Sequence, residues 1–108
     1  MSGSKASHRN GKRRLSAFLK VLHRHLPELR KRYRVRSLGI FGSYVSGVPR
    51  KGSDLDVLVE FVHEPSLFEF LELEASLSSV MGIKVDLVMR SALKPRIGRQ
   101  ILSELVSL

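Results

Sequence analysis

The stretch DLDVLVEF, residues 54–61, restricts the fold more than any other part of the chain. Its alternation predicts a β-strand, with Leu55, Val57, Val59 and Phe61 on one face and Asp54, Asp56, Leu58 and Glu60 on the other. Aspartate is unfavourable in strands, because its short charged side chain competes with the backbone and resists burial. Two aspartates on one face of a strand therefore need a positive counter-charge.

Apolar periodicity predicts a helix and a strand before this segment. The helix carries a stripe of residues spaced three and four apart, namely Leu15, Phe18, Leu19, Leu22, Leu26 and Leu29. Pro27 interrupts this stripe, so we expect a kink or a restart of the helix near Leu26. Residues 35–41 (VRSLGIF) predict a first strand that ends at Gly42 and leads into a short helix.

Two more helices and one more strand are predicted after it. Pro65 is a suitable first residue for a helix that Gly82 ends. Residues 83–89 (IKVDLVM) predict a third strand. Ser91 is the expected N-cap of a last helix with Pro95 in its first turn, and its stripe is Leu93, Ile97, Ile101 and Leu105. This order predicts an α/β or α+β domain, in which helices pack on a small mixed sheet.

Length and composition place the chain among small soluble domains. The 108 residues suffice for one core, and we expect one domain over residues 14–108. Residues 1–13 are polar, basic and without apolar periodicity, which predicts a disordered tail. The absence of cysteine excludes disulfides and zinc-thiolate sites, and no apolar run has the length of a membrane span. We therefore expect a cytoplasmic protein with no membrane partner.

The formal net charge of +9 at pH 7 indicates an anionic partner, and its distribution is uneven. Seven of the ten acidic residues lie in a segment without Lys or Arg, namely Asp54, Asp56, Glu60, Glu64, Glu69, Glu72 and Glu74. This pattern fits a site where metal cations meet an anionic substrate better than it fits a uniformly basic nucleic-acid binder. For Glu69, Glu72 and Glu74 we favour a simpler interpretation, in which they line the outer face of one helix.

The carboxylates of the second and third predicted strands have the arrangement of a metal site. Residues i and i+2 of a strand have Cα atoms roughly 6.5–7 Å apart, so Asp54 and Asp56 can converge on ions held between them. Asp86, from a later strand, would complete an all-oxygen site of the kind that magnesium prefers. The alternative is that these aspartates cap turns at the ends of strands. Asp56, however, lies inside the alternating strand, and Asp86 lies between Val85 and Leu87, so turn capping does not account for them.

The turn after the first strand supplies groups that a phosphate needs. Gly42 lets the backbone approach closely, and Ser43 adds a hydroxyl to the amide donors of the following short helix. A helix N-cap is an equally good interpretation of Ser43 alone. Arg50 and Lys51 either add charge to a bound triphosphate or lie solvated in an exposed turn. Carboxylates on one side and this turn on the other predict a site for a nucleoside triphosphate.

The spacing of these motifs resembles the signature of the DNA polymerase beta-type nucleotidyltransferase superfamily. Gly42-Ser43 is followed after ten residues by Asp54-Leu55-Asp56, with Asp86 on a later strand. The lead-in RVRSLGIFGS and the strand SDLDVLVEF resemble its minimal nucleotidyltransferase (MNT-domain) members, and LKPRIGRQILSE resembles their C-terminal helix. The resemblance covers nearly everything from Leu15 onward. It implies the polymerase beta-type nucleotidyltransferase fold.

The resemblance also implies a reaction, in which a hydroxyl attacks the α-phosphate of ATP and pyrophosphate leaves. Asp54 and Asp56 would hold two magnesium ions, and Asp86 would bind the first of them and accept the proton. Gly42 and Ser43 would hold the β- and γ-phosphates. The family often carries Arg two residues after the position of Tyr44, where this chain has Ser46, so one expected phosphate contact is missing.

The resemblance further implies a partner, because minimal members are commonly encoded beside HEPN-domain toxins. The chain would then be a type VII antitoxin that transfers AMP to a tyrosine hydroxyl of the toxin. Two alternatives remain open. In the first, the chain is a non-catalytic module that neutralises a toxin by binding. In the second, it modifies RNA or a small molecule, although the absence of an acceptor-binding domain disfavours this and leaves nucleic-acid binding through the basic surface possible.

Overall fold

The computed structural model describes residues 3–47, 49 and 52–108. Its elements are α1 (Gly3–Tyr33), β1 (Val35–Phe41), α2 (Ser43–Ser46), β2 (Leu55–Phe61), α3 (Leu67–Met81), β3 (Val85–Met89), the 3-10 helix η1 (Arg90–Ala92), α4 (Pro95–Glu104) and β4 (Val106–Ser107). The predicted order of elements is confirmed, with η1 and β4 in addition. The predicted class, helices on a small mixed sheet, is confirmed as well.

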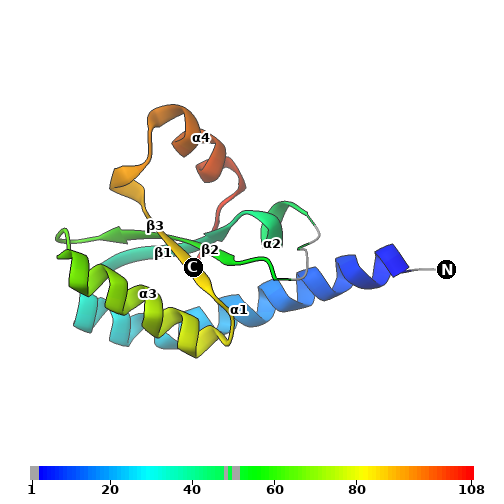
Figure 1. Ribbon diagram of the computed structural model, residues 1–108, viewed down its shortest axis with the longest axis horizontal. Helices are drawn as coiled ribbons and strands as arrows, with labels where there is room; N and C mark the ends of the chain where they lie inside the picture. The colour runs from blue at the N-terminus through cyan, green and yellow to red at the C-terminus, as the bar shows by residue number, and fades with distance from the viewer. Residues whose placement is uncertain (1–2, 48, 50–51) are drawn as a thin grey trace.

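The four strands form one sheet in the order β3-β2-β1-β4. β1 is antiparallel to both β2 and β4, whereas β2 and β3 are parallel. Consequently the end of β1 and the starts of β2 and β3 lie at the same edge of the sheet. Figure 1 shows α1 and α3 on one face of the sheet, with α4 on the opposite side.

The main core lies between the sheet and the two helices α1 and α3. The stripe of α1 contributes the buried Phe18, Leu22, Leu26 and Leu29, and β2 contributes Leu55, Val57 and Val59. Both predicted apolar faces are therefore confirmed. Full burial of such a side chain stabilises the fold by about 1.5–3 kcal/mol. The opposite face of β2 is not wholly polar, because Leu58 is only 4% exposed.

α1 differs from the prediction at Pro27, inside the helix, and at its N-terminal end. It is a single helix that contains Pro27, so of the two predicted alternatives, a kink or a restart near Leu26, the restart is wrong. Burial of Leu26 and Leu29 on either side of Pro27 outweighs the hydrogen bond that proline cannot donate. The backbone of residues 3–13 continues α1, where composition predicts a disordered tail. No proline stands in these residues, and adding residues to an existing helix costs little.

Two predicted helix starts are wrong, and capping explains the first. α3 begins at Leu67 instead of Pro65, because Ser66 accepts a hydrogen bond from the Glu69 N–H in a capping box. Ser91 is not an N-cap but lies in η1, and α4 begins with Pro95 as its first residue. Pro95 in the first turn and the end of α3 at Gly82, which has φ 69°, are confirmed.

A short C-terminal strand is absent from the prediction. α4 ends at Glu104, so Leu105 does not extend its stripe. Val106 and Ser107 instead form β4 opposite Ile40 and Gly39 of β1. Among the described residues, no helix combines the length and the apolar character that crossing a membrane requires.

Candidate active site

Two of the three predicted aspartates face each other across neighbouring strands. Asp56 of β2 is the register partner of Asp86 of β3, and paired strands lie about 4.8 Å apart. Asp54 lies immediately before β2, and its carboxylate is 3.8 Å from the ammonium of Lys84. The parallel pairing of β2 and β3 thus brings Asp54, Asp56 and Asp86 to one edge of the sheet.

Gly42 joins this edge from β1. Phe41, the last residue of β1, is the register partner of Asp56, and Gly42 follows with φ 81° and ψ −152°. This backbone conformation is essentially restricted to glycine. A Cβ atom on residue 42 would also overlap Oδ2 of Asp56. The turn and the carboxylate therefore fit together only because residue 42 has no side chain.

α2 starts directly after this glycine. The Gly42 carbonyl accepts hydrogen bonds from the amides of Val45 and Ser46, both at 3.0 Å, and from the Ser46 hydroxyl at 3.0 Å. The N-cap is Gly42, so the alternative interpretation of Ser43 as the N-cap is wrong, and Ser43 is the first residue of α2. Ser46, which stands in place of the expected arginine, is thus engaged with the turn itself.

A fourth carboxylate, which sequence reasoning missed, also reaches this edge. Glu104, at the end of α4, accepts a hydrogen bond from the Gly42 amide at 3.1 Å. Burial raises the pKa of Asp56 above its ordinary value, and the neighbouring charges of Asp86, Asp54 and Glu104 raise it further. The four carboxylates therefore act on one another electrostatically.

The carboxylates at this edge have the chemistry of a magnesium site. Within the described ranges, no three His, Cys, Asp or Glu side chains are already arranged as a metal cage. Magnesium, however, is usually held by one or two carboxylates together with waters and substrate phosphates. The mutual repulsion that raises the pKa of Asp56 is what a bound cation would relieve. Asp54, Asp56 and Asp86 therefore fit the ion by their donor type.

A hollow of about 330 Å³ opens beside Asp54. It is lined by Arg14, Tyr44, Gly52, Ser53, Asp54, Gly82, Ile83 and Lys84. Arg14 and Lys84 place two positive charges there, and the Arg14 guanidinium lies 5.2 Å from the centre of the Tyr44 ring. Arg50 and Lys51, the predicted basic residues near the triphosphate, lie outside the described residues.

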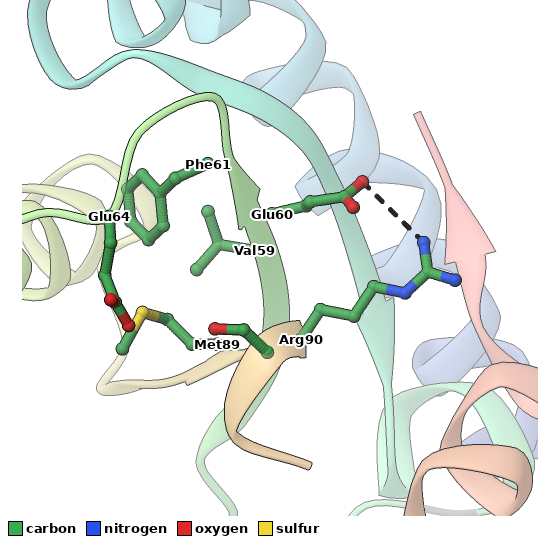
Figure 2. Close-up of a pocket in the computed structure, with 7 residues that line it drawn as sticks. Val59, Glu60, Phe61, Glu64, Met89 and Arg90 are labelled. Atoms are coloured by element: carbon green, nitrogen blue, oxygen red, sulfur yellow. Dashed lines mark ion pairs between the residues drawn. The ribbon is translucent and has the colours of Figure 1, made fainter. Parts of the chain in front are cut away.

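A larger hollow, of about 550 Å³, lies at the other end of β2. It is lined by Val59, Glu60, Phe61, Glu64, Met89, Arg90 and Ser91, and the Arg90 guanidinium is 3.6 Å from the Glu60 carboxylate (Figure 2). None of the predicted site residues lines it. The chemistry of the carboxylates, and not the size of a hollow, therefore locates the candidate site.

Tyr44 and His63 lie outside the set of predicted site residues. Tyr44 is 3% exposed and packs edge-on against Phe18, with ring centres 5.4 Å apart, so it belongs to the core. His63 lies exposed in a bend.

The three glutamates of α3 make structural contacts away from the site. Glu69 closes the capping box, Glu72 accepts a 2.7 Å hydrogen bond from Arg32, and Glu74 accepts one from the Leu87 amide. Glu69 and Glu72 are exposed, as expected for the outer face of a helix, whereas that interpretation is wrong for Glu74, which is half-buried and reaches β3 at Leu87.

Comparison with known proteins places this geometry in context. The family described as "Nucleotidyltransferase domain" matches residues 22–108. The chain is 49% identical over 86 residues to the protein adenylyltransferase MntA of Thermococcus cleftensis, a match that covers 80% of this chain and 87% of that protein.

Solved structures agree with this match. A minimal nucleotidyltransferase superposes with a TM-score of 0.70 and 32% identity, over 83% of this chain and 92% of that one. A chain from the complex of a tri-AMPylated Shewanella oneidensis HEPN toxin with an MNT antitoxin gives a TM-score of 0.57 at 20% identity. That match covers 90% of this chain and 70% of the other, and it concerns the fold alone.

Proposed function

The chain belongs to the nucleotidyltransferase domain family, and we propose that it transfers AMP from ATP to a hydroxyl group of a partner protein. The observation that carries this proposal is the pairing of Asp56 with Asp86 beside the turn at Gly42 and Ser43. The 49% identity to a protein adenylyltransferase supports adenylyl transfer to a protein in particular.

The reaction forms one bond and breaks one bond. The acceptor oxygen bonds to the α-phosphorus of ATP, the bond from that phosphorus to the pyrophosphate oxygen breaks, and the hydroxyl proton passes to a base. Two magnesium ions, when bound, would lower the pKa of the attacking hydroxyl and stabilise the leaving pyrophosphate. Asp54 and Asp56 would hold both ions, while Asp86 would hold the first ion and receive the proton. Gly42 and Ser43 would orient the β- and γ-phosphates.

The hollow beside Asp54 suits the nucleotide. Arg14 and Lys84 would attract the anionic phosphates. Asp54 lines the same hollow, so a metal ion held by Asp54 would lie beside those phosphates. Tyr44 closes the hollow from the core side, because its hydroxyl donates a 3.5 Å hydrogen bond to the Ser53 carbonyl.

We propose a HEPN toxin as the partner and a tyrosine of that toxin as the acceptor, so that the chain acts as a type VII antitoxin. The support is the MNT antitoxin fold that occurs in complex with an AMPylated HEPN toxin.

Mass spectrometry of the intact toxin tests this function directly. The toxin is incubated with this chain, ATP and magnesium, and we expect it to gain one or more AMP groups. Asp56→Asn and Asp86→Asn should each slow the transfer by at least about 100-fold, more than the loss of an outer-shell group costs. Glu64→Gln is the matched control, because it removes a carboxylate from the hollow at the other end of β2.

Three results would contradict the proposal. An unmodified but inhibited toxin would indicate neutralisation by binding alone. Modification of RNA, with a steep dependence on salt, would indicate a nucleic-acid acceptor instead. Equal activity of Asp56→Asn and the unmodified chain would refute the metal assignment.

A further inference from the structure

The amide of Gly42 has a specific partner far away in the sequence. It donates a hydrogen bond of 3.1 Å to Oε1 of Glu104, across 62 residues of chain. Glu104 is half-buried and is the last residue of α4. A carboxylate that accepts a backbone N–H makes a stronger hydrogen bond than a neutral oxygen does. This contact therefore ties α4 to the turn that follows β1.

The chain after Glu104 holds that side chain in place. Val106 pairs with Ile40, and the Leu108 amide donates a 3.1 Å hydrogen bond to the Leu38 carbonyl. Leu105 packs directly over Gly39, where an added Cβ atom would lie 2.6 Å from Cδ1 of Leu105. The nearest of these contacts, at Ile40, lies two residues before Gly42, so β4 fixes the position of Glu104 relative to the turn.

The backbone of Gly42 needs such a restraint. Glycine reaches this conformation, φ 81° and ψ −152°, without strain but reaches many others as easily, so its own backbone does not hold the turn. The same residue directs Ser43 into α2 and lies against the Asp56 carboxylate. A turn that relaxed at Gly42 would move the hydroxyl of Ser43 relative to the metal-binding carboxylates.

We propose that Glu104 is a positioning residue, which holds the Gly42–Ser43 turn in register with Asp56 by accepting the Gly42 amide hydrogen. This inference rests on the proposed function, because it assigns the turn to the phosphates of the nucleotide. Glu104 acts through Gly42 and does not itself touch the substrate.

The negative charge of Glu104 offers a different explanation of an effect on nucleotide binding. The experiment must distinguish this charge effect from positioning through the hydrogen bond. Glu104 adds to the negative potential at Asp56, so it could act by attracting cations alone. Glu104→Gln removes the charge but keeps an oxygen that can accept the same hydrogen bond. Glu104→Ala removes both. The two variants therefore distinguish hydrogen bonding from charge.

Affinity for a non-hydrolysable ATP analogue with magnesium, measured by calorimetry without any acceptor, is the first readout. We expect Glu104→Ala to weaken binding by about 10–100-fold, the range typical of groups that orient a first shell. Glu104→Gln keeps a weaker, neutral form of the same hydrogen bond, so we expect a clearly smaller loss of about 3–10-fold, because charge-assisted hydrogen bonds are roughly twice as strong as neutral ones. In turnover, the loss in Glu104→Ala should be larger in KM for ATP than in kcat.

Equal losses in Glu104→Gln and Glu104→Ala would overturn positioning in favour of charge, and unchanged affinity in Glu104→Ala would remove Glu104 from the site. If Glu104→Ala does not fold, amide hydrogen exchange of Gly42 in the unmodified chain and in Glu104→Gln decides the question. Slow exchange in both supports the proposal, whereas fast exchange in either contradicts it. Because the calorimetry and the amide exchange need no acceptor, an unmodified toxin would refute the proposed function without affecting these two measurements.

Discussion

Asp56 lies so close to Gly42 that a Cβ atom on residue 42 would overlap its Oδ2 atom. The contact follows from the register of the sheet, because Phe41 and Asp56 are partners in the antiparallel pair of β1 and β2. The turn proposed to hold phosphates and the carboxylate proposed to hold metal are therefore one packed unit, and a change in either should disturb the other.

Gly42→Ala should test this unit. The positive φ of 81° costs a residue with a Cβ about 1–3 kcal/mol, and the overlap must in addition displace Asp56. We expect lower stability in chemical denaturation together with a loss of nucleotidyl transfer of at least about tenfold. Gly52→Ala is the matched control, since Gly52 has a similar φ of 83° but no atom within 4 Å of its added Cβ. Because Gly52 also lines the hollow beside Asp54, the two variants are compared by stability, and equal losses of stability would mean that backbone strain and not the contact with Asp56 is responsible.

The raised pKa of Asp56 predicts how stability depends on pH. Burial, together with Asp86, Asp54 and Glu104, makes the folded chain bind this proton more tightly than the unfolded chain does. The stability that Asp56 contributes is therefore present below its unfolded pKa of about 3.9 and is lost as pH rises through the higher folded pKa.

Asp56→Asn should consequently raise the thermal midpoint at pH 7 in the presence of a chelator. The size of the increase measures how much more tightly the folded chain binds this proton than the unfolded chain does. The difference from the unmodified chain should vanish toward pH 3.5. Added magnesium should stabilise the unmodified chain more than Asp56→Asn, because a ligand stabilises the state that binds it. A lower midpoint for Asp56→Asn at pH 7 would contradict this account.

Ser66 should matter for stability, whereas Ser91 should not. Ser66 accepts the Glu69 amide hydrogen bond at 3.2 Å, and losing such a cap costs about 1 kcal/mol. Ser66→Ala should therefore unfold at lower denaturant concentration. Ser91→Ala serves as the control, because Ser91 is exposed and lies in η1, before α4 begins. Equal midpoints for the two variants would show that the capping box contributes nothing measurable.

The parts of the fold that follow from local pattern were predictable from the sequence. These parts are the apolar stripe of α1, the alternation of β2 and the end of α3 at a glycine. Each depends only on residues that lie a few positions apart in the sequence. The grouping of Asp54, Asp56 and Asp86 followed from the order of elements, because a helix between two strands favours their parallel pairing. The start of α3 was wrong because the apolar run and Pro65 were given more weight than the Ser66–Glu69 capping box.

The parts that depend on long-range pairing were not predictable in this way. β4 has two residues, too few for a periodic pattern, and it exists because β1 offers a free edge beside it. In the sequence, nothing distinguishes Glu104 from any glutamate at the end of a surface helix. Its contact with Gly42 arises only when the chain returns to β1, so no spacing within the sequence indicates it.

Gly39→Ala tests whether this returning chain supports the site. The new Cβ would lie 2.6 Å from Cδ1 of Leu105 and 3.0 Å from the Val106 carbonyl oxygen, so the Leu105 side chain must move and the Val106 backbone must give by a few tenths of an ångström. Overpacking of this kind costs about 1–3 kcal/mol, and we expect nucleotide affinity to fall as Glu104 moves away from Gly42. Gly98→Ala, in α4, is the control: its Cβ would make only ordinary contact at 3.5 Å with Leu93, and alanine favours a helix.

A second substitution separates overpacking from other effects of Gly39→Ala. Leu105→Ala removes the atoms that the new Cβ would meet, so the double variant should lose less stability than the sum of the two single variants. A coupling of at least about 0.5 kcal/mol in denaturant unfolding, with partial recovery of nucleotide affinity, is the expected result. Strictly additive losses of stability would mean that Gly39 and Leu105 act independently. A displacement of β4 would then not explain an effect at the turn of Gly42.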